Sequence, residues 1–276
     1  MESVMKNFSL ILIPAAFLVA FLSTISFAQN NHTFIHDHQG YYMNVDYIQI
    51  QQIDIVSFEN SVEEIIKPIQ QARIDSEYIK EWYIYRVAFP GSRNTQYNYV
   101  VVSISNEICG FEDISNQISV SFDHDDLDEK MATYFNLMAP NHSELWKINN
   151  SVLVSSEAKP SRYFLMDYMN VRSGMEYAYL MMEDEIARPL HEIRMENGNM
   201  EGWEIFSLIT PGGTEYGYNF AAGNHVNSLR NIEFGFSEEL IRQNRPDTNV
   251  REFFDNVEET RDLVRSELWE LVNHVK

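Results

Sequence analysis

An internal disulfide framework is excluded, because Cys109 is the only cysteine among the 276 residues. The fold must therefore rest on its apolar core, and a hydrophobic content of 45% supplies the material for one. A lone cysteine is more often a small apolar residue than a nucleophile, so we expect Cys109 to be buried. Glycine-rich phosphate loops, metalloprotease helix motifs, nucleophile elbows and paired-cysteine metal sites are also missing. No motif in this sequence therefore indicates a particular reaction or cofactor.

Basic residues are scarce, since 20 Lys and Arg stand against 41 Asp and Glu, giving a formal net charge of −21. Such a charge argues against nucleic acid and anionic membrane surfaces as partners. It is also typical of a soluble exported protein.

Only one long hydrophobic run is present, from Phe8 to Phe27, and it ends in the small-x-small pattern Ser26-Phe27-Ala28. This pattern predicts a secretory signal peptide over residues 1–28 and an exported protein, periplasmic or extracellular. The alternative is an uncleaved anchor, because about 20 apolar residues can span a bilayer. After cleavage we expect no membrane association.

A duplication dominates the remaining sequence. Residues of the first copy recur 121 positions later (203 − 82 = 121), namely Trp82, Pro90-Gly91 and Tyr97-Asn98 as Trp203, Pro211-Gly212 and Tyr218-Asn219. Further on the offset becomes 123, pairing Ser143-Glu144-Leu145-Trp146 with Ser266-Glu267-Leu268-Trp269. The unit is domain-sized, whereas solenoid repeats run to about 20–50 residues. We predict repeat 1 over 42–155, a linker over 156–162 and repeat 2 over 163–276.

Two polar stretches allow two interpretations each. Residues 29–41 are predicted to be a disordered N-terminal segment, although His32, His36, Asp37 and His38 could gather a metal ion. The acidic run 123–129 is predicted to be a solvated helix start, with carboxylates near the positive end of the helix dipole. A calcium loop is the alternative, but the glycine that such a loop requires is missing. We therefore predict no metal site.

The same order of elements is predicted twice. In repeat 1 it is a strand over 42–53, a helix over 57–74 bent at Pro68, a hairpin of strands over 82–89 and 96–105, and a closing helix. In repeat 2 the closing helix is predicted over Val250 to Val272, with Glu267 and Glu270 turned away from its apolar stripe. This order predicts an α+β fold of two tandem ferredoxin-like domains.

With this element order, bent first helix, Trp strand, Pro-Gly turn and Tyr strand, the chain resembles the dimeric α+β barrel superfamily. Its members include small cofactor-free monooxygenases, haem-handling proteins, NIPSNAP-like proteins and stress-responsive barrel domains. The resemblance implies that two sheets face each other around a cavity, with the helices outside. Here both sheets would come from one chain, as an intrachain pseudo-dimer. The fold hosts many functions and does not itself imply a reaction.

Strand parity places a candidate site between the two sheets. Side chains alternate across a strand, so if Ile48, Ile50, Met169 and Val171 lie under the helices, their neighbours face the barrel interior. The resulting candidates for ligand binding are Tyr47, Gln49, Tyr168 and Asn170, with Trp82 and Trp203 nearby. Buried Tyr and amide groups need hydrogen-bond partners, which a ligand can supply.

Four further candidates have an ordinary structural interpretation beside the functional one. Arg73 and Arg194 end the first helix of each repeat, where the helix dipole favours a cation, and a pocket role is the alternative. His191 and His225 could face a cavity as a base or ligand, or be ordinary core or surface histidines.

Two functions remain open from the sequence. In the first, the protein is a binding or structural module whose barrel holds a small apolar or aromatic molecule. In the second, it is a monooxygenase- or isomerase-like enzyme or a haem-handling protein. The first is preferred, because no activated acid, base or nucleophile pair is visible.

Export is directly testable. The protein purified from its native host should begin at Gln29, because cleavage follows Ala28. Intact mass spectrometry checks this, and a chain that keeps residues 1–28 and sediments with membranes would contradict it.

Overall fold

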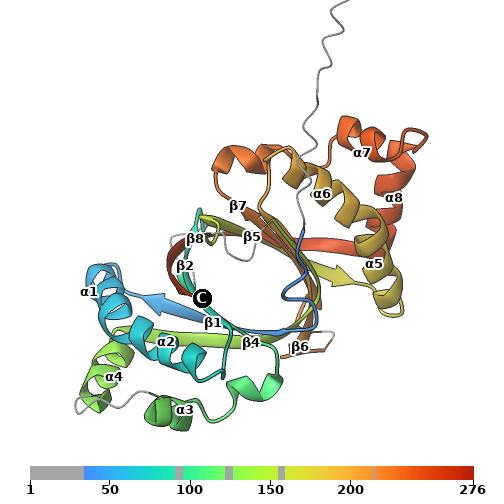
Figure 1. Ribbon diagram of the computed structural model, residues 1–276. Helices are drawn as coiled ribbons and strands as arrows, with labels where there is room; N and C mark the ends of the chain where they lie inside the picture. Colours follow the sequence, from blue (N-terminus) through green and yellow to red (C-terminus); the bar gives the residue numbers. More distant parts are fainter. Residues whose placement is uncertain (1–33, 91–95, 122–126, 155–158, 214) are drawn as a thin grey trace, which may run out of the picture. The chain divides into compact units, whose positions relative to one another are not determined.

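The computed structural model describes residues 34–90, 96–121, 127–154, 159–213 and 215–276, so the predicted signal peptide lies outside the described residues. In this part of the chain, the strands close into one antiparallel barrel with the neighbour order β1-β3-β2-β8-β5-β7-β6-β4 (Figure 1). The strands are β1 (Tyr42–Ile50), β2 (Glu81–Ala88), β3 (Tyr99–Ser105), β4 (Met138–Leu153), β5 (Tyr163–Val171), β6 (Gly202–Thr210), β7 (Phe220–Val226) and β8 (Arg261–Val275).

The two longest strands join the repeats. β4 pairs with β1 of its own repeat and with β6 of the other, and β8 pairs with β5 and with β2. Each repeat therefore lends one strand to the other, and the backbone groups of β4 and β8 are paired on both sides. The predicted α+β fold with an intrachain pseudo-dimeric barrel is confirmed.

The predicted closing helix over Val250 to Val272 is wrong in its second half. The helix α8 spans Val250–Thr260, and β8 begins at Arg261. In repeat 1, α4 (Leu127–Asn136) likewise gives way to β4. The helical spacing of apolar residues was misleading, because the pairing of β8 with two neighbouring strands decides the conformation.

The helices cover the outer face of the barrel. Those of repeat 1 lie over the β1, β2 and β3 side, and those of repeat 2 lie over the β5, β6 and β7 side (Figure 1). Besides α4 and α8 they are α1 (Ile55–Ser61), α2 (Lys67–Asp75), α3 (Ile114–Ser121), α5 (Glu176–Met182), α6 (Arg188–Glu196) and α7 (Glu238–Asn244).

The predicted bend at the prolines coincides with a wider turn. In repeat 1 a π-helical turn, Val62–Ile66, separates α1 from α2. In repeat 2 the equivalent turn, Glu183–Ala187, separates α5 from α6. Pro68 and Pro189 follow it in the first turn of α2 and α6. Proline has no N–H to donate, so it fits where the regular hydrogen-bond ladder is already interrupted.

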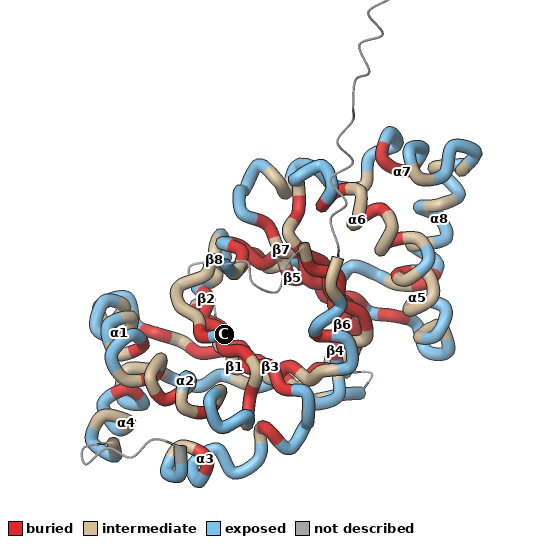
Figure 2. The backbone as a smooth tube through the Cα atoms, in the orientation of Figure 1, coloured by how far each residue is buried: buried red, intermediate tan, exposed pale blue. Residues whose placement is uncertain are grey.

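Buried residues are concentrated along the strands (Figure 2). Their side chains form one cluster inside the strand wall and others outside it. The interior layer is rich in aromatic residues from strands of both repeats. Two outer layers lie between the strands and the helices, one for each repeat. Trp82 belongs to the outer layer of repeat 1 and Trp203 to that of repeat 2, so their predicted place beside the interior is wrong.

The repeated Tyr-Asn motif has a structural role that is the same in both copies. The side chain of Asn98 accepts a hydrogen bond from the Ile50 N–H at 2.8 Å and donates to the Ile50 carbonyl at 2.9 Å. Asn219 makes the same pair of bonds to Val171, at 2.8 and 3.0 Å. Each asparagine thus secures the end of the first strand of its repeat.

The single cysteine differs from expectation. Cys109 is exposed, in a 3-10 turn over Ile108–Phe111, where the thiol donates to Glu107. A four-residue turn on the surface offers no apolar layer to receive it. Part of the acidic run, 123–126, lies outside the described residues.

Candidate functional site

The interior brings the two predicted tyrosines together. Tyr47 of β1 and Tyr168 of β5 are both fully buried, and their hydroxyl oxygens lie 2.7 Å apart. Ile48 and Ile50 lie under the helices of repeat 1, and Met169 and Val171 under those of repeat 2. The assignment of faces from strand parity is therefore confirmed. Burial raises the pKa of both tyrosines well above the ordinary value, so both hydroxyls keep their protons.

A buried carboxylate organises this interior. Glu144 of β4 is only 1% exposed. Its Oε2 accepts from the Tyr47 hydroxyl at 2.7 Å and from the Trp146 indole N–H at 3.0 Å. Its Oε1 accepts from the hydroxyls of Tyr216, at 2.5 Å, and Tyr218. Four donors from both repeats therefore compensate for the removal of the carboxylate from water.

The second half of the barrel carries a looser counterpart. Glu267 of β8 accepts from the Tyr97 hydroxyl and from the Trp269 indole at 3.0 Å. Arg265 lies 3.6 Å from this carboxylate, and its guanidinium stacks 4.2 Å above the ring of Tyr168.

His142 occupies the equivalent position in repeat 1 (142 + 123 = 265) and stacks on Tyr47 with ring centroids 4.2 Å apart. Burial lowers the pKa of His142, so its ring is neutral at pH 7. The two halves therefore differ by one positive charge.

This interior is occupied by protein side chains rather than arranged as an open lumen. Tyr97, Tyr218, Trp146 and Trp269 all belong to its buried cluster. Gln49 is half-buried and its Nε2 donates to the Ile50 carbonyl, while Asn170 is exposed. Neither amide joins the tyrosine network, so the predicted set of four lumen residues reduces to the two tyrosines. A cavity of about 340 Å³ beside Tyr97, Arg265 and Glu267 lies at one end.

The other end of the barrel is closed by the segment before β1. His38 Nδ1 lies 2.8 Å from Glu204 and its Nε2 lies 3.3 Å from Glu81. His225 also contacts Glu204, at 3.0 Å, and Lys276 contacts Glu81, at 3.3 Å. A cavity of only about 50 Å³ remains there, lined by His225, Tyr83 and Tyr85 among others.

The prediction of a disordered segment over 29–41 is thus wrong for residues 34–41. Ile35 forms a β-bridge with Leu153, and His36 bonds the Ser151 carbonyl at 2.6 Å. The ion pairs of His38 hold this segment against the barrel. His32, the first member of the alternative metal set, lies outside the described residues.

An open cleft lies on the outer face of repeat 1. It has a volume of about 260 Å³ and extends between β1 and the helices α3 and α4. Ile48 and Trp82 contribute from the strands, and Ile114, Met131 and Phe135 from the helices. The cleft is therefore mainly apolar, and three of the predicted candidates, Tyr47, Trp82 and Arg73, line it.

Two charged groups border this cleft. Asp46 accepts from Ser143 at 2.5 Å and from Asn44 at 2.9 Å, and burial raises its pKa. Arg73 is buried and donates to Gln117 through Nε at 3.1 Å and through Nη2 at 3.0 Å. A ligand in the cleft would meet a carboxylate acceptor on an otherwise apolar wall.

The equivalent layer of repeat 2 carries polar groups in place of apolar ones. Phe58, Val62 and Met138 of repeat 1 correspond to Tyr179, Glu183 and Arg261 (58 + 121, 62 + 121, 138 + 123). Burial raises the pKa of Glu183 to about 7. His191 stacks on Trp203 in the same region, with ring centroids 5.3 Å apart, and burial keeps it neutral by lowering its pKa.

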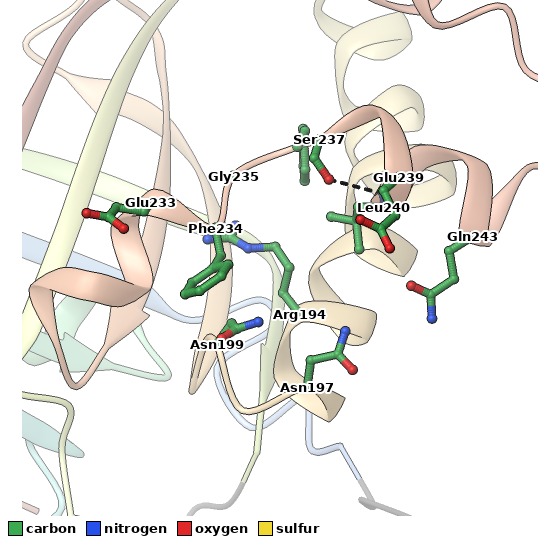
Figure 3. Close-up of a pocket in the computed structure, with 11 residues that line it drawn as sticks. Arg194, Asn197, Asn199, Glu233, Phe234, Gly235, Ser237, Glu239, Leu240 and Gln243 are labelled. Carbon is green, nitrogen blue, oxygen red and sulfur yellow. Dashed lines mark hydrogen bonds between the residues drawn. The ribbon is translucent and has the colours of Figure 1, made fainter.

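A second open cavity, of about 430 Å³, lies at the end of α6 (Figure 3). Arg194 extends into it from α6, and the loop with Phe234 and Gly235 forms the opposite wall (Figure 3). Arg194 Nη1 lies 3.0 Å from His191 Nδ1. The four candidates outside the lumen therefore lie apart: His225 at the barrel end, Arg73 at the cleft, and Arg194 with His191 here.

Metal and membrane features are not seen in the described part of the chain. No group of three or more His, Cys, Asp and Glu residues there is arranged to hold a metal ion. None of the helices described combines the length and apolar character needed to cross a membrane.

No family model matches the chain, and no curated protein matches it. Solved structures do. A proposed monooxygenase from Fusobacterium nucleatum has a TM-score of 0.53 at 8% identity, covering 86% of this chain and 94% of its own. A proposed monooxygenase from Lactobacillus acidophilus has 0.51 at 7%, covering 86% and 97%. A haem-binding protein from Thermus thermophilus has 0.49 at 8%, covering 86% and 92%. At such identities the likeness shows the fold alone, which is that of the dimeric α+β barrels.

Glu144, Glu267 and Glu204 were missed as site residues by sequence reasoning, and His38 was named only as a member of the alternative metal set. The repeated Ser-Glu-Leu-Trp tetrapeptide was a signal for the first two, because an acid kept at the same place in both copies has a shared role. No sequence pattern pointed to the pairing of His38 with Glu204, which are 166 residues apart.

Replacing Glu144 with Gln should lower the free energy of unfolding by about 3 kcal/mol, because an amide leaves some of the four donors without an acceptor. Urea unfolding followed by tryptophan fluorescence measures the loss. Glu267→Gln is the matched control and should cost less, since fewer donors reach that carboxylate. An equal or smaller loss for Glu144→Gln would contradict the role of this residue.

His38 should make stability depend on pH. Burial would lower its pKa, but Glu204 and Glu81 raise it from 6.5 to about 10. Because the pKa of His38 is higher in the folded than in the unfolded state, its contribution to folding stability is fully present below pH about 6.5. This contribution is lost as the pH rises through about 10. Between pH 7 and pH 10 the wild type should therefore lose about 3 kcal/mol more than His38→Gln. His36→Gln should behave as the wild type, and identical pH profiles for all three would refute the assignment.

Proposed function

We propose that this is an exported binding protein that takes a small apolar or aromatic molecule in the cleft of repeat 1. The observation that carries the proposal is the cleft itself, about 260 Å³ in volume, with apolar walls and the acceptor Asp46. Concave, mostly apolar sites with a few polar groups are the usual form of small-molecule sites.

The difference between the repeats supports this choice. In repeat 1 the layer under the first helix is apolar, with Phe58 and Val62 buried, whereas repeat 2 has Tyr179 and Glu183. An apolar ligand loses no hydrogen bonds in the first environment and would leave buried charges poorly solvated in the second. The proposed ligand site is therefore single, in spite of the duplication.

Partially exposed apolar side chains at the cleft also favour an apolar ligand. Ile114 is 40% exposed and Phe135 is 53% exposed, and both line it. A ligand that covered them would remove this area from water, at roughly 25 cal/mol for each Å² buried.

A binding function is favoured over catalysis because the charged side chains at the cleft already have hydrogen-bond partners in the protein. Asp46 is bonded by Ser143 and Asn44, and Arg73 by Gln117 and Gln70, so both are held by protein partners. His225, a candidate base, lines the cavity of about 50 Å³ at the barrel end, which has little room for a substrate. Export is proposed on the strength of residues 1–28, and the acidic charge supports a ligand other than nucleic acid.

The cleft can be tested with N-phenyl-1-naphthylamine, a neutral apolar dye whose fluorescence rises in apolar sites. The wild type should bind it, and Ile114→Lys should weaken binding on the order of tenfold or more, because a charge then stands on the apolar wall. Val56→Lys is the matched control, since Val56 is 71% exposed on α1 and does not line the cleft.

Equal dye binding by the two lysine variants and the wild type would contradict the proposed site. An absorbance scan of the purified protein gives an independent check, because a bound haem or flavin would favour the haem-handling or enzyme alternative.

A further inference from the structure

The two repeats treat an equivalent arginine differently. Arg73 and Arg194 lie at the same place in α2 and α6 (73 + 121 = 194). In repeat 1 the carboxamide oxygen of Gln117 accepts from Arg73 Nε at 3.1 Å and from Nη2 at 3.0 Å. A single acceptor oxygen thus takes both donors on this edge of the guanidinium.

In repeat 2 no described protein group takes that place. Arg194 is only 7% exposed, and its Nε is buried without a hydrogen-bond partner among the described residues. A buried donor without a partner costs free energy, so the position calls for an acceptor. Burial lowers the pKa of Arg194 to about 10, which leaves the guanidinium charged at pH 7.

A cavity of about 430 Å³ adjoins this guanidinium (Figure 3). Its lining is largely polar and includes the side chains of Asn197, Asn199 and Ser237. Two exposed acids, Glu233 and Glu239, line it as well. Figure 3 shows the two acids on opposite sides of Arg194, with the side chain of Glu233 directed away from it. The cavity thus offers one buried cation and the carboxylate of Glu239 to the same occupant.

We propose that this cavity binds a small zwitterion, whose carboxylate bonds Arg194 and whose ammonium group faces Glu239. A free amino acid or a dipeptide has this chemistry. The site is separate from the cleft of repeat 1 and does not depend on the function proposed for it.

Charge favours a zwitterion over a phosphate. A doubly charged phosphate would be repelled by Glu239, while the ammonium group of a zwitterion is attracted to it. Arg194 Nε is out of contact with solvent, so the ligand must displace lining side chains to reach it.

Isothermal titration calorimetry of the full mature chain tests the site with L-alanyl-L-alanine as the probe. The dipeptide should bind, and two analogues separate its ends. The C-terminal amide lacks the carboxylate and the N-acetyl form lacks the ammonium group, so each should bind on the order of ten- to a hundredfold more weakly. Inorganic phosphate should bind more weakly than the dipeptide.

Two variants test which residue contacts the carboxylate of the dipeptide and which contacts its ammonium group. Arg194→Lys keeps the charge but loses the planar set of donors, and should weaken dipeptide binding on the order of tenfold or more. Glu239→Gln changes one exposed residue, and should abolish the preference for the dipeptide over its N-acetyl form, whereas Glu233→Gln should keep it. Arg242→Lys on α7, which does not line the cavity, should bind as the wild type does.

Circular dichroism and thermal unfolding confirm that each variant is folded, and if Arg194→Lys is not, the Glu239→Gln variant still decides the matter. The proposal is overturned if the wild type gives no heat of binding at millimolar dipeptide. It is equally overturned if the wild type does not discriminate between the dipeptide and its analogues.

Discussion

The structure depends on one buried carboxylate near the centre of the barrel. Glu144 would be costly to hide from water by itself, and the hydroxyls of Tyr47, Tyr216 and Tyr218 together with the Trp146 indole make its burial tolerable. These donors belong to both repeats, so satisfying one side chain requires both halves of the sheet to be in place. The contact between Tyr47 and Tyr168 extends the same network across the interior. A polar network of this kind specifies one register more sharply than apolar packing can.

The two repeats share their backbone architecture, but they differ in the polar and charged side chains under their helices. The strand ends secured by Asn98 and Asn219 remain alike, as do the π-helical turns. Under the helices, however, Val62 faces an apolar layer while its counterpart Glu183 is a buried acid whose pKa is raised to about 7 by burial. Gln117 accepts a hydrogen bond from Arg73 Nε, whereas Arg194 Nε has no hydrogen-bond partner among the described residues. Differences of this kind are invisible to fold comparison, which sees only the shared frame.

Sequence reasoning recovered what periodicity and repetition encode. The alternation around Tyr47 and Tyr168 gave their face correctly, and the shared element order gave the barrel. It failed where the outcome depends on distant pairing. Arg261–Val275 has a helical pattern of apolar residues, yet lies between β2 and β5 as a strand, and so Glu267 points inward rather than away. His38 is ordered only because Glu204, far away in the sequence, meets it. On the outer face, Arg73 and Arg194 were named with a pocket role as the alternative, whereas Asp46 was not named as a candidate.

The location of both proposed sites outside the strand wall follows from barrel size. An eight-stranded barrel has an interior about wide enough for its own side chains. Here aromatic residues such as Trp146 and Trp269 occupy that space, so adding a ligand would require removing part of the network around Glu144. The outer faces have no such constraint, because a helix can lie farther from the sheet without breaking any hydrogen bond between strands. A duplicated barrel therefore offers two outer faces that can change independently, while its interior must stay as it is to hold the two halves together.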